Sequence, residues 1–483
     1  MTDKPFTPRP AFDAARTPIE PDVFAAMMAG LGPFESAPHL AVGVSGGADS
    51  MALVLLCDEW ARARGGRVSA LIVEHGLRAD SKLEATGVKS RLGERGIEAH
   101  ILPWQGNKPQ SGIQAAARTA RFRLLTGWAR KAGVLHLFLG HHRDDQAETF
   151  LMRLDAKSGV DGLSAMSAIV ERDGVRVLRP FLSVPKVQLI ATVTKRKTRW
   201  IEDPSNKNRS YARVRVRDAL ESTNDAIGDP GLGAGKIAGF ARQMAPLRME
   251  QEKKTWALLG RAVRLCAEGF AVLDADGLKE AAPALSFRVL HRVLRCIGGR
   301  EHGPRLDKTE RLLDHILGDH PVAGRTLGGC GVFSSDKKEK EKGRLGHFII
   351  CRERRSEPKL QAAFPDGSVY WDGRFSIDFT KQLENEMTPS SAGPFWIAPL
   401  GREGWQEIVA VDESLKAQAR PPLPALVRLG LPTLWDGAGV VEVPHLDYRR
   451  VNHKRDMGLP LVSIEKILFR PRHSLSGTGF CLA

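Results

Sequence analysis

The chain has 483 residues, more than a single hydrophobic core usually serves, so we expect two or three domains. Lysine and arginine total 71 against 56 aspartate and glutamate residues, and the formal charge of +15 favours a polyanionic partner such as nucleic acid. The six cysteines stand singly, without metal-ligand spacing, and no apolar run reaches the roughly 18 residues that cross a bilayer. The sequence therefore speaks against a structural zinc site, an iron–sulfur cluster and a membrane-spanning protein, and predicts a cytoplasmic protein with reduced thiols.

The first segment, residues 1–38, is rich in proline, alanine and isolated charges. One short amphipathic stretch runs from Asp22 to Leu31 and predicts a helix. We expect the segment to be a mobile leader that carries this helix and no chemistry.

From His39 onward, short apolar runs alternate with longer stretches that place apolar residues at three- and four-residue spacing. The runs predict strands at His39–Val44, Val68–Glu74, Ala99–Leu102 and Val134–Leu139. The stretches predict helices at Asp49–Arg64, Ser81–Arg95 and Gly112–Lys131. Strict alternation of strand and helix predicts an α/β domain over residues 39–220, with a parallel sheet covered on both faces.

Past this domain the composition changes twice. Ser222–Lys236 is rich in glycine and reads as a linker, and residues 237–320 have the spacing of a helical domain. The charge cluster Ser334–Lys342 separates two β-prone pieces and predicts the tip of a hairpin. Residues 321–483 are therefore expected to form a smaller β-containing C-terminal domain.

The strongest chemical signal directly follows the first predicted strand and directly precedes the first predicted helix. Glycines there allow a tight turn that points several N–H groups at one spot, and the helix N-terminus adds its positive dipole end, so the turn is suited to hold phosphate. An ordinary glycine-rich turn is the structural alternative. A carboxylate in such a loop can also bridge Mg²⁺ to the phosphates. The residues are Ser45, Gly46, Gly47, Ala48, Asp49 and Ser50.

This loop resembles the pyrophosphate loop (PP-loop) of the N-type ATP pyrophosphatases. Further motifs, in the same order along the chain, resemble those of the tRNA(Ile)-lysidine synthase family: Val73–Ser81, Ala116–Phe122, Gly140–Thr149 and Trp200–Asn206. The close resemblance covers Ala41 to Arg217. Two residues depart from the family pattern, because Glu74 stands where aspartate is usual and Phe122 where tyrosine is usual.

The resemblance implies ATP and Mg²⁺ as cofactors. It implies that the loop residues, together with Glu74 and His75, bind the nucleotide, and that Asp49 holds the metal. Arg121 would neutralise charge on the α-phosphate, since a fixed guanidinium group suits that task. The structural alternative for Arg121 is a place on an exposed, solvated helix face. His141 would contact phosphate or assist proton transfer.

Asp145 and Glu148 are three residues apart on a predicted helix and therefore share a face, where they could capture a lysine ammonium. An acidic first helical turn, favoured by the helix dipole, is the alternative. A metal site is a second alternative and would use His141, His142, Asp144 and Asp145.

A dense basic stretch surrounds the Trp200–Asn206 motif and favours contact with an RNA backbone. Its residues are Lys195, Arg196, Lys197, Arg199, Lys207, Arg209, Arg213, Arg215 and Arg217. A solvated charged surface is the alternative.

By resemblance, the expected reaction is ATP-dependent adenylation of the wobble cytidine of tRNA(Ile), followed by ligation of free L-lysine. A tRNA thiolase with the same ATP chemistry is the nearest rival, although its usual cysteine pair is missing. A catalytically decayed RNA-binding protein and a small-molecule amidotransferase-type ligase are the others, and the latter lacks an N-terminal nucleophile cysteine.

Overall fold

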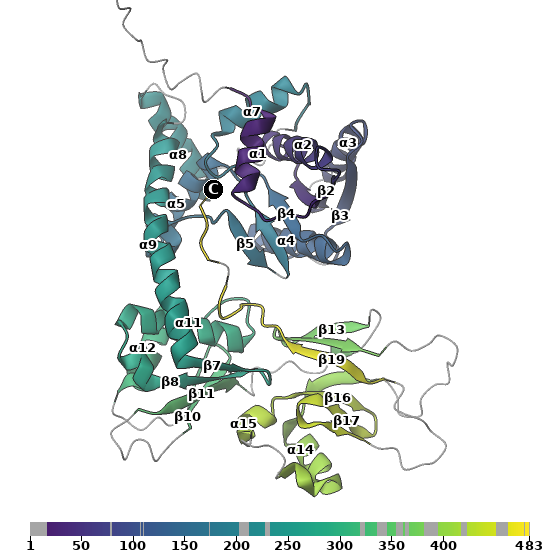
Figure 1. Cartoon of the computed structure of the whole chain (residues 1–483), viewed down its shortest axis with the longest axis vertical. Coiled ribbons are helices and arrows are strands. Elements are labelled where there is room, and N and C mark those ends of the chain that lie inside the picture. Colours follow the sequence, from purple (N-terminus) through teal and green to yellow (C-terminus); the bar gives the residue numbers. More distant parts are fainter. Residues whose placement is uncertain are drawn as a thin grey trace, which may run out of the picture. The chain divides into compact units, whose positions relative to one another are not determined.

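The computed structural model describes residues 17–77, 80–106, 108–109, 111–172, 174–201, 212–227, 232–318, 324–335, 345–353, 361–362, 367–380, 395–416, 423–450, 462–477 and 479–482. The chain forms two compact units (Figure 1). The first consists of residues 1–252 and 478–483, and the second of residues 253–477. No helix in these ranges is both long and apolar enough for a membrane crossing.

The first unit is built on a six-stranded sheet in which all strands but β5 are parallel. The strand order is β3 (Glu98–Pro103), β2 (Arg67–Glu74), β1 (His39–Val44), β4 (His136–Leu139), β6 (Val175–Leu178), β5 (Ile169–Arg172). The central strand β1 has no polar side chain after His39, and its residues from Leu40 to Val44 are buried because both faces of the strand are covered. The predicted parallel sheet is thus confirmed, and the β5–β6 hairpin is an addition that the sequence pattern did not indicate.

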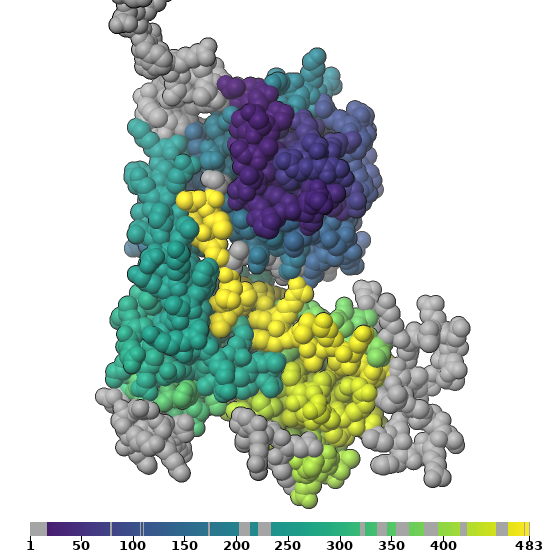
Figure 2. All heavy atoms as spheres, viewed as in Figure 1, coloured from purple at the N-terminus to yellow at the C-terminus, as the bar shows by residue number. Residues whose placement is uncertain are grey.

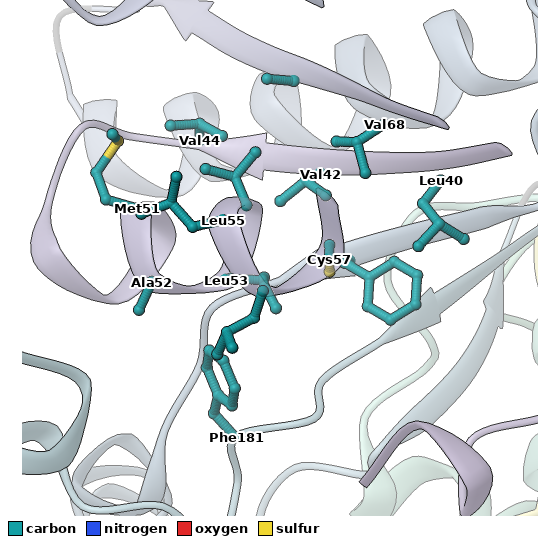
Figure 3. Close-up of a cluster of buried hydrophobic side chains, with 14 of the residues drawn as sticks. Leu40, Val42, Val44, Met51, Ala52, Leu53, Leu55, Cys57, Val68 and Phe181 are labelled. Atoms are coloured by element: carbon teal, nitrogen blue, oxygen red, sulfur yellow. The ribbon is translucent and has the colours of Figure 1, made fainter. Parts of the chain in front are cut away.

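Helices cover both faces of this sheet, as expected. One apolar cluster joins the strands to α2 (Ala48–Arg62), α3 (Ser81–Gly93) and α7 (Lys186–Lys195), and Figure 3 shows its centre between β1 and α2. A second cluster packs α4 (Ile113–Lys131) against the other face, through Leu125 and Ala129. The remaining helices of the unit's α/β part are α5 (Arg143–Asp155) and α6 (Val160–Leu163).

The expectation of a mobile leader is corrected for residues 17–38; residues 1–16 lie outside the described residues. The predicted helix exists as α1 (Pro21–Ala29), but it is part of the core. The Phe24 ring packs 6.1 Å from that of Phe181, and the Ile19 amide donates to Thr192 Oγ1 at 2.9 Å. Prolines at the start of the segment suggested disorder, whereas its few apolar residues are enough to anchor it in a groove of the domain.

The predicted linker is also corrected, because helices occupy most of Ser222–Lys236. Helix α8 (Ala212–Ile227) runs into it and α9 (Leu232–Ala262) begins inside it. Ala234 is buried in one apolar cluster with Ala147 of α5, so the start of α9 packs on the first unit; residues 228–231, which carry part of the glycine signal, lie outside the described residues. The boundary between the compact units falls at residues 252 and 253, within α9.

The second unit begins with an antiparallel five-stranded sheet under three helices. Its strand order is β7 (Val263–Cys266), β8 (Phe270–Asp274), β11 (His347–Arg352), β10 (Cys330–Ser334), β9 (Arg325–Leu327), and its helices are α10 (Ala275–Lys279), α11 (Pro283–Gly298) and α12 (Leu306–Leu317). The predicted hairpin is confirmed by the pairing of Phe333 with Ile349; its tip lies outside the described residues. The helical prediction for residues 237–320 missed β7 and β8, which are too short to show a clear period.

The rest of the second unit is β-rich, as the sequence predicts. One sheet has the order β12 (Gln361–Ala362), β15 (Trp396–Pro399), β16 (Pro432–Asp436), β17 (Gly439–Val443), β18 (Tyr448–Arg449), and another has β13 (Ser368–Trp371), β14 (Phe375–Phe379), β19 (Ile464–Phe469). The short helices are α14 (Gly401–Val411), α15 (Ala425–Arg428), η4 (Glu413–Lys416) and η5 (Pro444–Leu446).

The last described residues return to the first unit. The Cys481 amide donates to Ser167 Oγ at 3.0 Å, and its carbonyl accepts from the Ala168 amide at 2.9 Å. Arg248 of α9 stacks over the Phe480 ring at 4.4 Å, and Figure 2 shows this yellow segment alongside α9. The segment therefore ties α9 to the edge of the parallel sheet.

If α1 belongs to the core, Phe24→Ala will destabilise the first unit by about 3–5 kcal/mol, because Phe24 is 1% exposed and the substitution leaves a cavity. Val23→Ala on the same helix is the control, since Val23 is 44% exposed. Denaturant unfolding of the full chain measures both. Equal midpoints for the two variants would mean that α1 is not part of the folding unit.

Candidate active site

The candidate site lies where two turns meet at the carboxyl edge of the parallel sheet. Strand β1 lies between β2 and β4, so the chain leaves β1 at the point where strand order reverses, the usual ligand position in open α/β sheets. The β1–α2 turn is the PP-loop, and the β4–α5 turn begins at Gly140. A Cβ atom added to Gly140 would lie 3.1 Å from the Asp49 carbonyl, so a side chain there would push the two turns apart by a few tenths of an ångström.

Hydrogen bonds from one side chain shape the PP-loop. Ser50 Oγ accepts from the Ser45 amide at 3.1 Å and donates to the Gly47 carbonyl at 3.0 Å. Gly46 has a φ of +87°, and a Cβ there would lie 2.8 Å from Val88 Cγ2. Helix α2 begins at Ala48, directly after the turn. The six predicted loop residues therefore form one compact turn at a helix N-terminus, suited to an anion.

Asp49, His142 and Asp145 form a buried charged cluster between the two turns. His142 Nε2 lies 3.6 Å from Asp49 Oδ2 and 3.5 Å from Asp145 Oδ2. Burial by itself would lower the pKa of His142, but the charge of Asp145 and the contact with Asp49 outweigh it and raise the pKa to about 9. Burial would likewise raise the pKa of Asp145, yet His142 and Arg213 lower it to about 2.

His141 differs from its neighbour because burial dominates its ionisation. Burial lowers the pKa of His141 to about 3; the charge of Asp145 acts against this shift, and the charges of Arg179 and Arg121 act with it. The side chain is therefore neutral at physiological pH, available as a hydrogen-bond acceptor or base but not as an acid. Arg121, partly buried on α4, is near enough to lower the pKa of His75 as well, although burial is the main cause there. Residues from three predicted motifs thus converge.

Asp145 and Glu148 lie together, as predicted, but both already have cationic partners. They are 9% and 1% exposed. Arg213 of α8 bridges the two carboxylates, and Arg217 Nε donates to Glu148 Oε1 at 2.7 Å. The Asp145 carboxylate also accepts from the His142 amide at 3.0 Å, so it caps α5, as the alternative of an acidic first turn expected.

The sequence reading placed Arg213 and Arg217 only in an RNA-facing basic stretch, and it gave His142 only a part in an alternative metal site. The structure turns all three toward the candidate site. Arg213 and Arg217 are four residues apart, a spacing that matches the pair of carboxylates on the facing helix, and this signal could have identified them. Lys207 and Arg209 lie outside the described residues.

Glu74 holds the turn after β2 rather than pointing away from the protein. Its Oε1 accepts from the Gly76 amide at 2.5 Å and from Ser81 Oγ at 2.7 Å. The neighbouring His75 lies edge-on to Trp104 at 6.1 Å. Both predicted nucleotide-binding residues therefore stand at the sheet edge beside the PP-loop. The Ile201 amide donates to the Gly46 carbonyl at 2.8 Å, which brings the start of the Trp200–Asn206 motif to the loop; the motif's remainder is outside the described ranges.

The donor set at Asp49 fits a magnesium ion. Asp49 Oδ2 faces His142, whereas Oδ1 is buried and has no hydrogen-bond partner among the described residues. A carboxylate oxygen is the ligand that Mg²⁺ prefers when phosphate oxygens complete its shell. In the described part of the chain, the candidate site included, no group of three or more histidine, cysteine, aspartate or glutamate side chains is arranged to hold a metal by itself, so the alternative metal site gains no support.

Comparison with known protein families identifies the class of the first domain. Residues 22–223 match a family described as a PP-loop domain, so the fold and the β1–α2 turn define a PP-loop protein. This range includes α1 and ends within α8.

The full chain then matches named relatives, all called tRNA(Ile)-lysidine synthase. The protein of Orientia tsutsugamushi is 30% identical over 86% of this chain and 91% of its own length. Those of Bradyrhizobium diazoefficiens and Rhodopseudomonas palustris are 40% and 45% identical, over 58% and 59% of this chain and 78% and 81% of their lengths. The chain belongs to the tRNA(Ile)-lysidine synthase family. Among solved structures, the U34-tRNA thiolase NcsA from Methanococcus maripaludis has a TM-score of 0.40 and 18% identity, over 46% of this chain and 78% of that one.

We expect Gly46→Ala to weaken binding of a non-hydrolysable ATP analogue by about tenfold or more, because a side chain at this positive φ costs ~1–2 kcal/mol and would collide with Val88. Gly93→Ala is the matched control, since nothing lies within 4 Å of a Cβ there. Calorimetric titration with the Mg²⁺–analogue complex gives both affinities. A folded Gly46→Ala protein with wild-type affinity would remove the PP-loop from the nucleotide site.

Proposed function

We propose that this chain is a tRNA(Ile)-lysidine synthase, an ATP-dependent carbon–nitrogen ligase that converts the wobble cytidine of tRNA(Ile) to lysidine. The observation that carries the proposal is the meeting of the PP-loop with the β4–α5 turn at one sheet edge, in a chain whose relatives of that name match most of its length. ATP, L-lysine and tRNA(Ile) are the substrates.

The chemistry proceeds in two steps. The C2 carbonyl oxygen of cytidine attacks the α-phosphorus of ATP, and pyrophosphate leaves. The lysine ε-amine then attacks C2, and AMP departs with the former carbonyl oxygen while the amine loses its proton. A carbonyl oxygen is a poor leaving group, so the first step makes the second one feasible.

Residues of the two turns supply the charge that these steps need. The PP-loop and the N-terminus of α2 hold the β- and γ-phosphates through backbone N–H groups. Arg121 offsets charge on the α-phosphate as pyrophosphate leaves. Asp49 would hold Mg²⁺, and a bound Mg²⁺ would offset the negative charge of the phosphate oxygens. His141, neutral because of its burial among arginines, accepts a hydrogen bond or a proton.

Asp145 and Glu148 are the candidates for holding a lysine ammonium. They are the acidic pair nearest to the PP-loop in the described β4–α5 segment, and their partners Arg213 and Arg217 already show that the pair attracts cations. Because those guanidinium groups already pair with the carboxylates, lysine can bind there only if Arg213 or Arg217 of α8 gives up part of its contact with Asp145 or Glu148. The α-carboxylate of lysine could then pair with a released arginine.

The second unit is proposed to contact the tRNA. Helix α11 carries Arg288, Arg292 and Arg295 at helical spacing, opposite the buried apolar stripe that includes Val289 and Val293. Positive charge along one helix face attracts an RNA backbone without reading its sequence. The choice of tRNA(Ile) therefore depends on shape as well as on the cytidine itself.

The test of this function is transfer of labelled lysine to tRNA(Ile) by the full chain with ATP and Mg²⁺. We expect incorporation that matches AMP and pyrophosphate release, and none into the same tRNA with uridine at the wobble position. AMP release that requires a sulfur donor would indicate a thiolase, and no turnover at all would indicate a decayed RNA-binding protein.

Asp49→Ala should abolish AMP release while leaving the fold intact, because the loop loses its only carboxylate. Asp58→Ala on the same helix is the control: Asp58 pairs with Arg62 on the protein surface, away from the loop. Release of AMP and the unfolding temperature are measured together. Wild-type turnover by the Asp49 variant would refute the assignment of this loop.

Glu148→Gln should raise the KM for lysine by about tenfold, since one charge-assisted contact is lost, and should leave the KM for ATP unchanged. Asp155→Asn, at the exposed end of the same helix, is the control. Steady-state kinetics with each substrate varied in turn separate the two constants. If only the unfolding temperature falls, Glu148 serves to dock α8 and lysine binds elsewhere.

A further inference from the structure

His142 joins the PP-loop to helix α5 through its side chain. It is 4% exposed, and its Nε2 atom lies within ion-pair distance of both Asp49 Oδ2 and Asp145 Oδ2. Asp49 belongs to the first turn of α2, and Asp145 to the first turn of α5. One imidazole therefore links the ends of two helices that follow different strands.

The position of this imidazole is fixed by its backbone. His142 is the N-cap of α5, and its amide donates to Asp145 Oδ2 at 3.0 Å. The next amide, that of Arg143, donates to the Val184 carbonyl at 2.9 Å. Two residues before His142, Gly140 packs against the Asp49 carbonyl. The backbone is thus fixed both before His142, at Gly140, and after it, at Arg143, and this places the ring next to Asp49.

The orientation of Asp49 follows from this contact. Because Oδ2 is directed at His142, the other oxygen, Oδ1, is left buried without a hydrogen-bond partner among the described residues. A carboxylate early in a helix could instead turn toward the backbone N–H groups of its own first turn. Contact with a neighbouring side chain is the usual way in which proteins fix the geometry of a metal-binding carboxylate.

We propose that His142 is a positioning residue, which holds Asp49 so that Oδ1 is presented to the Mg²⁺ ion that accompanies ATP. The proposal rests on the nucleotide part of the function given above and does not depend on the identity of the RNA. His142 does not touch the phosphates. It acts through Asp49, and its contact with Asp145 couples the PP-loop to α5.

Two substitutions separate this role from capping of α5. Asparagine is among the best N-cap residues, but its amide ends too near the backbone to reach Asp49, so His142→Asn preserves the cap and removes the bridge. Glutamine places its amide nitrogen close to the position of Nε2, so His142→Gln preserves the bridge. A purely structural role predicts that the asparagine variant is the better of the two, and a positioning role predicts the opposite.

The experiment is calorimetric binding of a non-hydrolysable ATP analogue to the full chain at a series of Mg²⁺ concentrations. We expect His142→Asn to raise the half-saturating Mg²⁺ concentration by about 10- to 100-fold, with an unchanged unfolding temperature, and His142→Gln to behave like the wild type. Wild-type Mg²⁺ dependence in the asparagine variant, or an equal defect in both variants, would overturn the proposal.

This measurement requires neither tRNA nor lysine, so its outcome is separable from that of the lysine-transfer assay. If the binding of Mg²⁺–nucleotide depends on His142 but no lysine is transferred, the role of His142 stands and the proposed function is refuted. If lysidine forms but the Mg²⁺ dependence does not change with His142, the proposed function stands and the role of His142 is refuted.

Discussion

The close approach of the β1–α2 and β4–α5 turns is the constraint on which the site depends. It requires β1 to lie between β2 and β4, so that consecutive crossovers diverge and leave space at the strand ends. Gly140 favours it too, since a side chain there would crowd the Asp49 backbone. With both conditions met, the N-termini of α2 and α5 lie at the same region, and groups distant in sequence meet there.

That region concentrates buried charge, which is costly unless each group is paired. The structure pairs them in a chain: Asp49 with His142, His142 with Asp145, and Asp145 with Arg213. Glu148 continues the chain to Arg213 and Arg217 of α8. The pairing explains why neighbouring histidines differ so much: contacts with two carboxylates raise the pKa of His142, whereas burial dominates at His141 and lowers its pKa, because the opposing charge of Asp145 is offset by nearby arginines. The same pairing makes α8 part of the site, although the helix lies far along the chain from the PP-loop.

The sequence predicts more of the fold near the site than away from it. The strands that carry the motifs are buried on both faces and appear as continuous apolar runs, so their bounds were predicted to within about two residues. The segment Ser222–Lys236 was misread because glycine and proline favour turns locally, whereas its described residues are helical and Ala234 of α9 joins the apolar cluster of α5. The leader was misread because residues such as Phe24 and Ile19 are sparse, and sparse apolar residues reveal a core contact only when their partners, such as Phe181, are known.

By itself, the sequence determined the order of the strands and helices from β1 to β4, the PP-loop between β1 and α2, and the residue types available at the ends of β2 and β4, because each of these is local in the chain. The tertiary structure decided which side chains meet. It brought Arg213 and Arg217 to the carboxylates of α5, set His142 against Asp49, and gave the two adjacent histidines opposite charge states. These outcomes depend on burial and on charges contributed by segments remote in sequence, and no local pattern encodes either quantity.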